Sequence, residues 1–201
     1  SHVQNYNFEY NKYGDISKVQ VGNKSLYENS VNDSNKTKTI KYNNDLYKSI
    51  YSNNGLLLSK LINDKELFNW QYNKSGQIYK HIDKNNSLYY LYDYDLQDNV
   101  STKSTYSSLN KRKSQINFSY DINGNLTGLN NNTGGHTFFH KFTYDRDNLV
   151  TKTQMALTKY YDYSYDSLNR LNKKSLHFND SKTVDTNFAY YLSDRNSPDE
   201  T

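Results

Sequence analysis

The stretch SYDINGNLTGL, residues 119–129, contains the pattern that decides the fold. Tyr120 ends a segment in which aromatic and polar residues alternate, turn-forming residues follow from Asp121 to Gly124, and the alternation resumes at Leu126. An Asp at the start of a turn accepts hydrogen bonds from backbone amides two residues later, and Gly tolerates the left-handed backbone that closes the turn. The stretch therefore predicts a β-hairpin with a three-residue loop and a G1 bulge, in which Tyr120 lies opposite Leu126.

The same pattern recurs along the chain, mostly at intervals of 21–26 residues. The anchors of the copies are eight tyrosines: Tyr10, Tyr51, Tyr72, Tyr94, Tyr120, Tyr144, Tyr165 and Tyr190. The position after the anchor predicts the start of the turn, as at Asp95, Asp121, Asp145 and Asp166. The fourth position after it predicts the left-handed residue, as at Gly14, Gly55, Gly76 and Gly124. The opening gap of 41 residues contains a segment, about 22–45, without a good copy, which predicts a degenerate repeat or a long hairpin there.

Aromatic residues also occupy most positions two and four residues before each anchor, as at Trp70, Tyr90 and Tyr92. This period of two predicts strands with one aromatic face. The mean hydropathy of −1.07 is low, but 22 Tyr, 8 Phe and 1 Trp exclude a disordered chain, because disordered segments are poor in aromatic residues. We therefore expect an all-β fold: a repetitive antiparallel β-hairpin sheet of about eight repeats, in a single array over residues 1–201 with a tyrosine-rich core.

Few residues suggest chemistry. The chain has no cysteine and no apolar run long enough for a membrane span. His136 and His140 are four residues apart, which in a strand is about 13 Å and too far for one metal ion. The net charge of +4 is too small and too evenly spread to predict nucleic-acid binding. The expectation is a protein that is not an enzyme, with no catalytic residue, no metal, no cofactor and no nucleic-acid partner.

The segments YDINGNL, YDRDNLV and YDSLNRL resemble the YD repeat of the RHS family. The resemblance implies a strip of β-sheet that spirals into part of a hollow shell in a longer protein. It further implies a structural scaffold in a large secreted bacterial toxin or wall-associated protein, extracellular or bound to the cell wall. The implied partners are neighbouring repeats of the parent chain or an enclosed C-terminal domain.

Two alternatives stay open. The choline-binding and glucan-binding wall repeats have a similar spacing, but their tryptophan-containing partner strand is missing here. A carbohydrate-binding adhesion module is the alternative function, with Trp70, Tyr72, Tyr90 and Tyr92 as the candidate glycan-stacking residues. A ladder of rings buried on one concave face would indicate the scaffold, whereas rings exposed in a groove would indicate the binding module.

Overall fold

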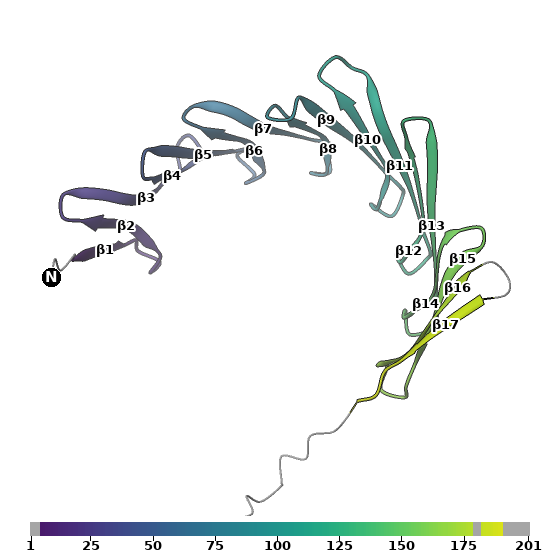
Figure 1. The fold of residues 1–201 in the computed structure, drawn as a ribbon. Coiled ribbons are helices and arrows are strands. Elements are labelled where there is room, and N and C mark those ends of the chain that lie inside the picture. Colours follow the sequence, from purple (N-terminus) through teal and green to yellow (C-terminus); the bar gives the residue numbers. More distant parts are fainter. Residues whose placement is uncertain (1–4, 179–181, 191–201) are drawn as a thin grey trace, which may run out of the picture. The chain divides into compact units, whose positions relative to one another are not determined.

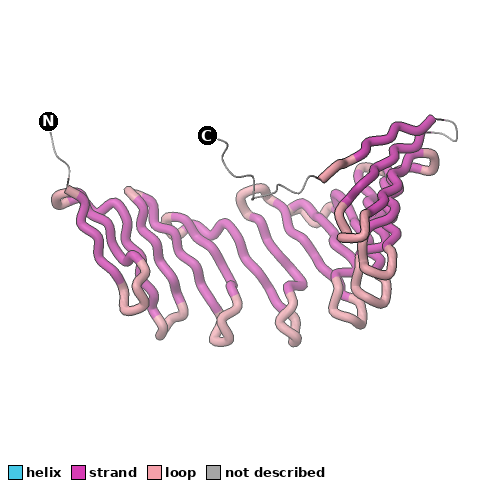
Figure 2. Tube along the Cα trace, turned by 90° about the horizontal axis from the view of Figure 1, so that it is seen from below, coloured by secondary structure: helices cyan, strands magenta, loops and turns pink. Residues whose placement is uncertain are grey.

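A computed structural model of the chain describes residues 5–178 and 182–190. These residues form seventeen β-strands, and all of the strands belong to antiparallel pairings in one sheet. Figure 2 shows strands joined by short loops, and no helix occurs in the described part of the chain. Consequently no helix long and apolar enough to cross a membrane is found in these residues.

The contacts between residues divide the chain into two compact units. The first unit contains Ser1–Asp93 and Thr102–Ser114, and the second contains Tyr94–Ser101 and Gln115–Thr201. The expectation of a single array over residues 1–201 stays a prediction. The strands are β1 (Tyr6–Tyr10), β2 (Ile16–Val21), β3 (Lys24–Asn32), β4 (Thr37–Tyr42), β5 (Asp45–Tyr51), β6 (Leu57–Ile62), β7 (Lys65–Tyr72), β8 (Ile78–Asp83), β9 (Leu88–Tyr94), β10 (Val100–Ser107), β11 (Arg112–Tyr120), β12 (Leu126–Thr133), β13 (His136–Tyr144), β14 (Val150–Ala156), β15 (Lys159–Tyr165), β16 (Leu171–Phe178) and β17 (Lys182–Asn187).

Each strand pairs with the strands next to it in sequence, from β1 to β9 in the first unit and from β12 to β17 in the second (Figure 1). Seven of the anchor tyrosines are the last residues of odd-numbered strands. The register places Tyr51 opposite Leu57 and Tyr72 opposite Ile78, each beside a bulge. This is the cross-strand pairing that the spacing of the repeats predicts.

The segment without a good repeat copy contains the β3–β4 hairpin. Its register pairs Asn32 with Thr37, so the loop has four residues, and Lys36 has a positive φ of 52°. The side chain of Asn32 accepts hydrogen bonds from the backbone amides of Ser34 and Asn35. Val31 lies 21 residues after Tyr10, where the spacing of the repeats would place an anchor tyrosine, and it is 65% exposed.

The tyrosine-rich core expected from the sequence is only partly formed. None of the described hydrophobic residues is fully buried, and most ladder rings in the middle of the sheet are half-buried. Within each unit, strands contact their sequence neighbours, and no part of residues 5–178 and 182–190 packs as a second layer over either face. A ring is therefore covered by its neighbours in the sheet and keeps one side toward water. At the edge strand β1, the rings of Tyr6, Phe8 and Tyr10 are 51–62% exposed.

Candidate functional site

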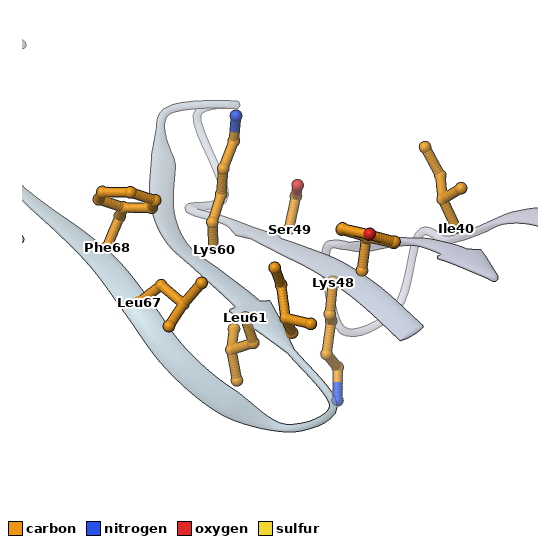
Figure 3. Close-up of a pocket in the computed structure, with 9 residues that line it drawn as sticks. Ile40, Lys48, Ser49, Lys60, Leu61, Leu67 and Phe68 are labelled. Carbon is orange, nitrogen blue, oxygen red and sulfur yellow. The ribbon is translucent and has the colours of Figure 1, made fainter. Parts of the chain in front are cut away.

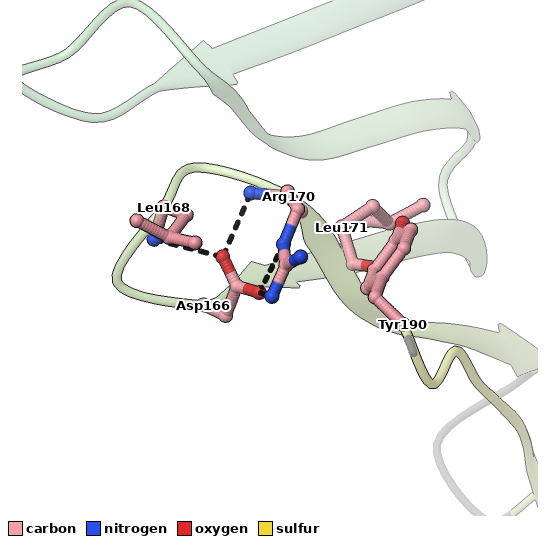
Figure 4. Close-up of polar contacts among 5 residues, drawn as sticks. All are labelled: Asp166, Leu168, Arg170, Leu171 and Tyr190. Atoms are coloured by element: carbon pink, nitrogen blue, oxygen red, sulfur yellow. Dashed lines mark hydrogen bonds and ion pairs between the residues drawn. The ribbon is translucent and has the colours of Figure 1, made fainter. Parts of the chain in front are cut away.

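The recurring structural site of this protein is the turn that follows the anchor tyrosines from Tyr10 to Tyr165. In the β11–β12 turn, one carboxylate oxygen of Asp121 accepts hydrogen bonds from the amides of Asn123 and Asn125, both at 2.9 Å. Figure 4 shows the same arrangement at Asp166, whose carboxylate accepts from the amides of Leu168 and Arg170. The Arg170 guanidinium closes this turn with a 2.7 Å ion pair to Asp166. The local sequence folds this way because the carboxylate satisfies amides that the hairpin leaves free.

The fourth residue of the turn has a left-handed backbone after every anchor from Tyr10 to Tyr165, whereas the turn after Tyr190 lies outside the described residues. The φ angles are +85° at Gly14, +79° at Gly55, +80° at Gly76 and +81° at Gly124. Asp98, Asn148 and Asn169 have φ angles of 60–66° at the equivalent positions. These residue types tolerate this conformation at low cost, which explains why they recur at this offset.

The turn hydrogen bonds also lower the pKa of three turn carboxylates, those of Asp95, Asp121 and Asp166. Hydrogen bonds from the side chain and backbone of Asn125 lower the pKa of Asp121. The backbone amide and guanidinium of Arg170 lower the pKa of Asp166. At Asp95, burial alone raises the pKa, but hydrogen bonds from Asn99 and Gln97 outweigh it and the pKa is lowered. The turn carboxylates are therefore charged acceptors, which fits a structural role.

A second recurring contact joins five of the repeats to the repeat before them, and we call it the tyrosine clip. The hydroxyl of an anchor tyrosine donates to the backbone carbonyl of the residue six positions after the preceding anchor. The clips, at 2.7–3.0 Å, are Tyr72 to Leu57, Tyr120 to Val100, Tyr144 to Leu126, Tyr165 to Val150 and Tyr190 to Leu171. Burial raises the pKa of Tyr72, and burial together with the charge of Asp121 raises that of Tyr144, so these hydroxyls remain donors. The spacing of the sequence predicted the tyrosines but not this bond.

The candidate glycan-stacking residues lie in a row of stacked rings on one face of the first unit. Trp70 stacks on His81 with centroids 5.0 Å apart, and His81 stacks on Tyr90 at 5.4 Å. The ammonium of Lys103 lies 4.9 Å from the Tyr90 ring centroid and 5.7 Å from that of Tyr92. All four candidates share this face, but Tyr72 is held by its clip, and Tyr90 and Tyr92 are covered by a lysine.

His81 and Lys103 were not found by the sequence reasoning. Each follows an anchor tyrosine by nine residues, Tyr72 and Tyr94 respectively, and packs on the rings that precede that anchor. Lys174 follows Tyr165 by the same nine residues, and its ammonium lies 4.2 Å from the Tyr161 ring centroid. The recurrence of Lys or His at this offset is a signal that could have revealed the contact.

A further hairpin turn also follows the repeat pattern and was missed. The segment YSSLNK, residues 106–111, has Ser107 at the first turn position and Asn110, with φ of 62°, at the fourth. The amide of Asn110 donates to the Ser107 carbonyl at 3.0 Å. Its likeness to YDSLNR, residues 165–170, is visible in the sequence, but its position breaks the 21–26-residue spacing.

The other face of the sheet carries polar clusters. In the first unit, Ser59 is 6% exposed and donates a 2.5 Å hydrogen bond to Glu66, which also pairs with Lys84. In the second unit, His177 contacts Asp162 at 3.0 Å and Thr183 at 3.2 Å. The side chains of His177 and Asp162 are 26% and 45% exposed, so this second cluster lies at the surface of the sheet. Among the described residues, no group of three or more His, Cys, Asp or Glu side chains could hold a metal ion.

Comparison with known proteins adds information on the fold. No family profile matches the sequence, and no curated protein matches it. Among solved structures, the chain is similar to one in the Photorhabdus luminescens Tc holotoxin pore, with a TM-score of 0.60 and 16% identity over 74% of this chain. It is also similar to a chain of the TcdB2-TccC3-TEV crystal structure, with a TM-score of 0.65 and 14% identity over 90% of this chain.

The chain has the fold of the repetitive β-sheet in these Tc toxin chains, and the resemblance to YD repeats is confirmed at the level of the fold. The predicted all-β hairpin sheet is also confirmed. The chain spans 9% and 12% of the length of the two solved chains. The activities and partners of the whole Tc proteins therefore enter only as proposals.

Proposed function

We propose that the chain is a non-catalytic structural scaffold, a segment of the wall of a hollow β-shell in a large secreted bacterial toxin. The observation that carries the proposal is the single-layer sheet whose consecutive repeats are joined by tyrosine clips. Such a sheet can extend by the addition of further repeats. A single layer of strands also encloses little space for the concave pocket in which an enzyme binds its substrate. The fold shared with the Tc toxin chains supports the proposal.

The partners in this proposal are neighbouring repeats of the parent chain and an enclosed domain. The exposed rings of Tyr6, Phe8 and Tyr10 on β1 support the first partner. In the middle of the sheet, equivalent rings such as Phe68 and Trp70 have a strand on each side and are half-buried. A further repeat beside β1 would bury the edge rings in the same way.

Electron cryo-microscopy of the complete natural polypeptide that contains these residues tests the proposal. We expect the strip to form part of the wall of a closed shell, with successive hairpins in the register described above. A structure in which these residues form an isolated stalk or a free-standing domain would contradict a role in a shell wall.

Carbohydrate binding is the second candidate, favoured by one observation. Trp70 is half-buried in a sheet without a second layer, so part of its indole remains open to solvent. Aromatic side chains with an open face stack on sugars. A glycan and cell-wall polysaccharide screen, followed by Trp70 fluorescence in solution, tests this function. Saturable binding that a Trp70→Ala variant loses in the glycan screen itself, which needs no tryptophan signal, would support it, and a folded protein that binds no glycan would exclude it.

A further inference from the structure

The two faces of the first unit differ in how their charges are arranged. We call the face that carries the anchor tyrosines and the rings before them the ladder face. On the opposite face, the register places Glu9, Lys18, Glu28 and Lys41 side by side across β1 to β4, so the charges alternate in sign. Lys18 and Glu9 form an ion pair there. Across β1 to β4 the opposite face therefore places each charge beside one of opposite sign, whereas Lys80, farther along this face, lies over the Tyr89 ring.

On the ladder face, one row of side chains has cations without a matching anion. The register places Lys38, Ser49, Lys60, Phe68 and Asp83 side by side from β4 to β8. Asp83 is the carboxylate of this row, but it is 7% exposed and accepts hydrogen bonds from Asn86. No ion pair joins Lys38 or Lys60 to a carboxylate in the residues that the structure describes. Figure 3 shows Lys60 and Lys48 pointing to opposite sides of the sheet, and only Lys48 has an anionic partner, Asp64.

The same arrangement recurs at the lysines over the rings. Lys103 lies over Tyr90 and Tyr92 in the first unit, and Lys174 lies over Tyr161 and Tyr163 in the second. Neither lysine forms an ion pair within the described ranges, whereas Lys173, on the other face of the same strand as Lys174, pairs with Asp185 at 2.9 Å. In both units the ladder face thus offers cations that are held by rings and remain free to pair with an anion.

We propose that the ladder face binds an acidic polypeptide segment through Lys38, Lys60 and Lys103. This inference goes beyond the scaffold role, because it defines the chemistry of a partner. Lys38 and Lys60 are two strands apart, about 10 Å, which an extended chain spans in about three residues. A segment in the polyproline II conformation has three residues per turn and rises about 3.1 Å per residue. Acidic side chains at every third position of such a segment lie on one side, about 9 Å apart, and would meet both ammonium groups.

The surroundings of the lysines favour a polypeptide over a sugar or a nucleic acid. Lysines already cover the ring faces of Tyr90 and Tyr92, so a sugar or a base has no open ring to stack on there. Beside Lys60, the side chains of Ile40, Tyr47 and Phe68 help to line a pocket of about 270 Å³ (Figure 3). An acidic peptide can place a carboxylate on the lysine and an apolar side chain on these residues.

The test uses the whole chain and a random copolymer of glutamate and tyrosine as the probe. Trp70 is the single tryptophan and lies on the ladder face, so its fluorescence reports binding there. The Lys60→Gln/Lys103→Gln variant removes two ladder-face cations, and the Lys18→Gln/Lys48→Gln variant removes two from the opposite face. We expect the first to weaken binding about tenfold or more and the second to change it less than about twofold.

A Lys103→Arg variant, with circular dichroism of every variant, separates loss of charge from loss of fold. Arginine can keep a cation over the rings, so binding should be retained. No saturable binding at low salt, or equal weakening by the two double variants, would overturn the proposal. Tighter binding of a sulfated glycan or a single-stranded oligonucleotide than of the copolymer would overturn the choice of a polypeptide. None of these results depends on whether the parent protein forms a shell.

Discussion

At the scale of single residues, the tyrosine hydroxyl has a role that its ring does not. The anchor ring pairs with an aliphatic residue across the hairpin, as Tyr72 does with Ile78, while its hydroxyl reaches the carbonyl of Leu57 in the preceding repeat. One side chain therefore stabilises two hairpins. Phenylalanine would preserve the first interaction and lose the second, so the two can be separated by experiment.

The clip predicts the effect of a single oxygen atom. Tyr144→Phe leaves the Leu126 carbonyl without its donor and should lower the free energy of unfolding by about 1 kcal/mol. Chemical denaturation followed by circular dichroism measures this change. Tyr13→Phe is the control, because Tyr13 is a turn residue and 77% exposed, and it should change stability little. Equal effects of the two substitutions would show that the clip contributes nothing.

His81 makes the stability of the first unit depend on pH. Burial lowers the pKa of His81, with a further lowering by Lys103 that opposes the raising effect of Asp83, and its Nε2 atom is buried without a hydrogen-bond partner. The unfolded chain therefore binds a proton at higher pH than the folded chain. The contribution of neutral His81 to the free energy of unfolding is complete above the ordinary histidine pKa of 6.5. This contribution is lost as the pH falls from 6.5 to the lower pKa of the folded state.

A His81→Phe variant should remove this part of the pH dependence. We expect the free energy of unfolding to fall less between pH 7.5 and 5 in the variant than in the original protein, as measured by denaturation at each pH. His136→Phe, at an exposed histidine, serves as the control and should keep the original slope. Unchanged slopes in both variants would show that another group causes the dependence.

At the scale of the hairpin element, the turns were predictable from the sequence and the contacts between hairpins were not. The turn depends on residues that are adjacent in sequence. Residues 121–125 make the hydrogen bonds of the β11–β12 turn and supply its left-handed backbone position. His81 and Lys103, each nine residues after an anchor tyrosine, contact the rings that precede that anchor. These contacts depend on which residues the register places side by side on neighbouring strands. Each bulge shifts this register by one residue, so the partners follow only from the folded sheet.

A pair of glycine substitutions in one hairpin tests the backbone requirement of the turn. Gly124→Ala places a side chain at φ of +81° and should cost about 1–2 kcal/mol of stability. Gly128→Ala lies in the following strand, where a new Cβ atom would be 3.5 Å from Ser119 Cβ, an ordinary contact. We expect Gly128→Ala to be neutral or slightly stabilising. Thermal denaturation of the two variants measures the difference, and a Gly128→Ala variant that is the less stable of the pair would contradict this explanation.

At the scale of the whole molecule, the sheet is a succession of nearest-neighbour contacts. Within each unit, strands contact the strands adjacent in sequence, and none of the described hydrophobic residues is fully buried. Stability in such arrays is approximately a sum of repeat and neighbour contributions. A local defect should therefore remain local.

Hydrogen exchange measured by mass spectrometry tests this locality. Gly124→Ala should speed amide exchange in peptides from β11 to β13 and leave peptides from β4 to β7 at their original rates. The original protein under the same conditions is the reference. Faster exchange throughout both units would show that the array unfolds as one cooperative body.

The sequence by itself determined the hairpins, their left-handed turn residues and the aromatic alternation, because each depends on residues close together in the chain. The tertiary structure decided which atoms join one repeat to the next: the clip from Tyr165 to Val150, the lysine over the Tyr90 ring, and the difference in charge between the two faces. It also decided that the rings are half-buried, because burial depends on what packs over a face. These features depend on register and layering, which bring together residues far apart in the sequence.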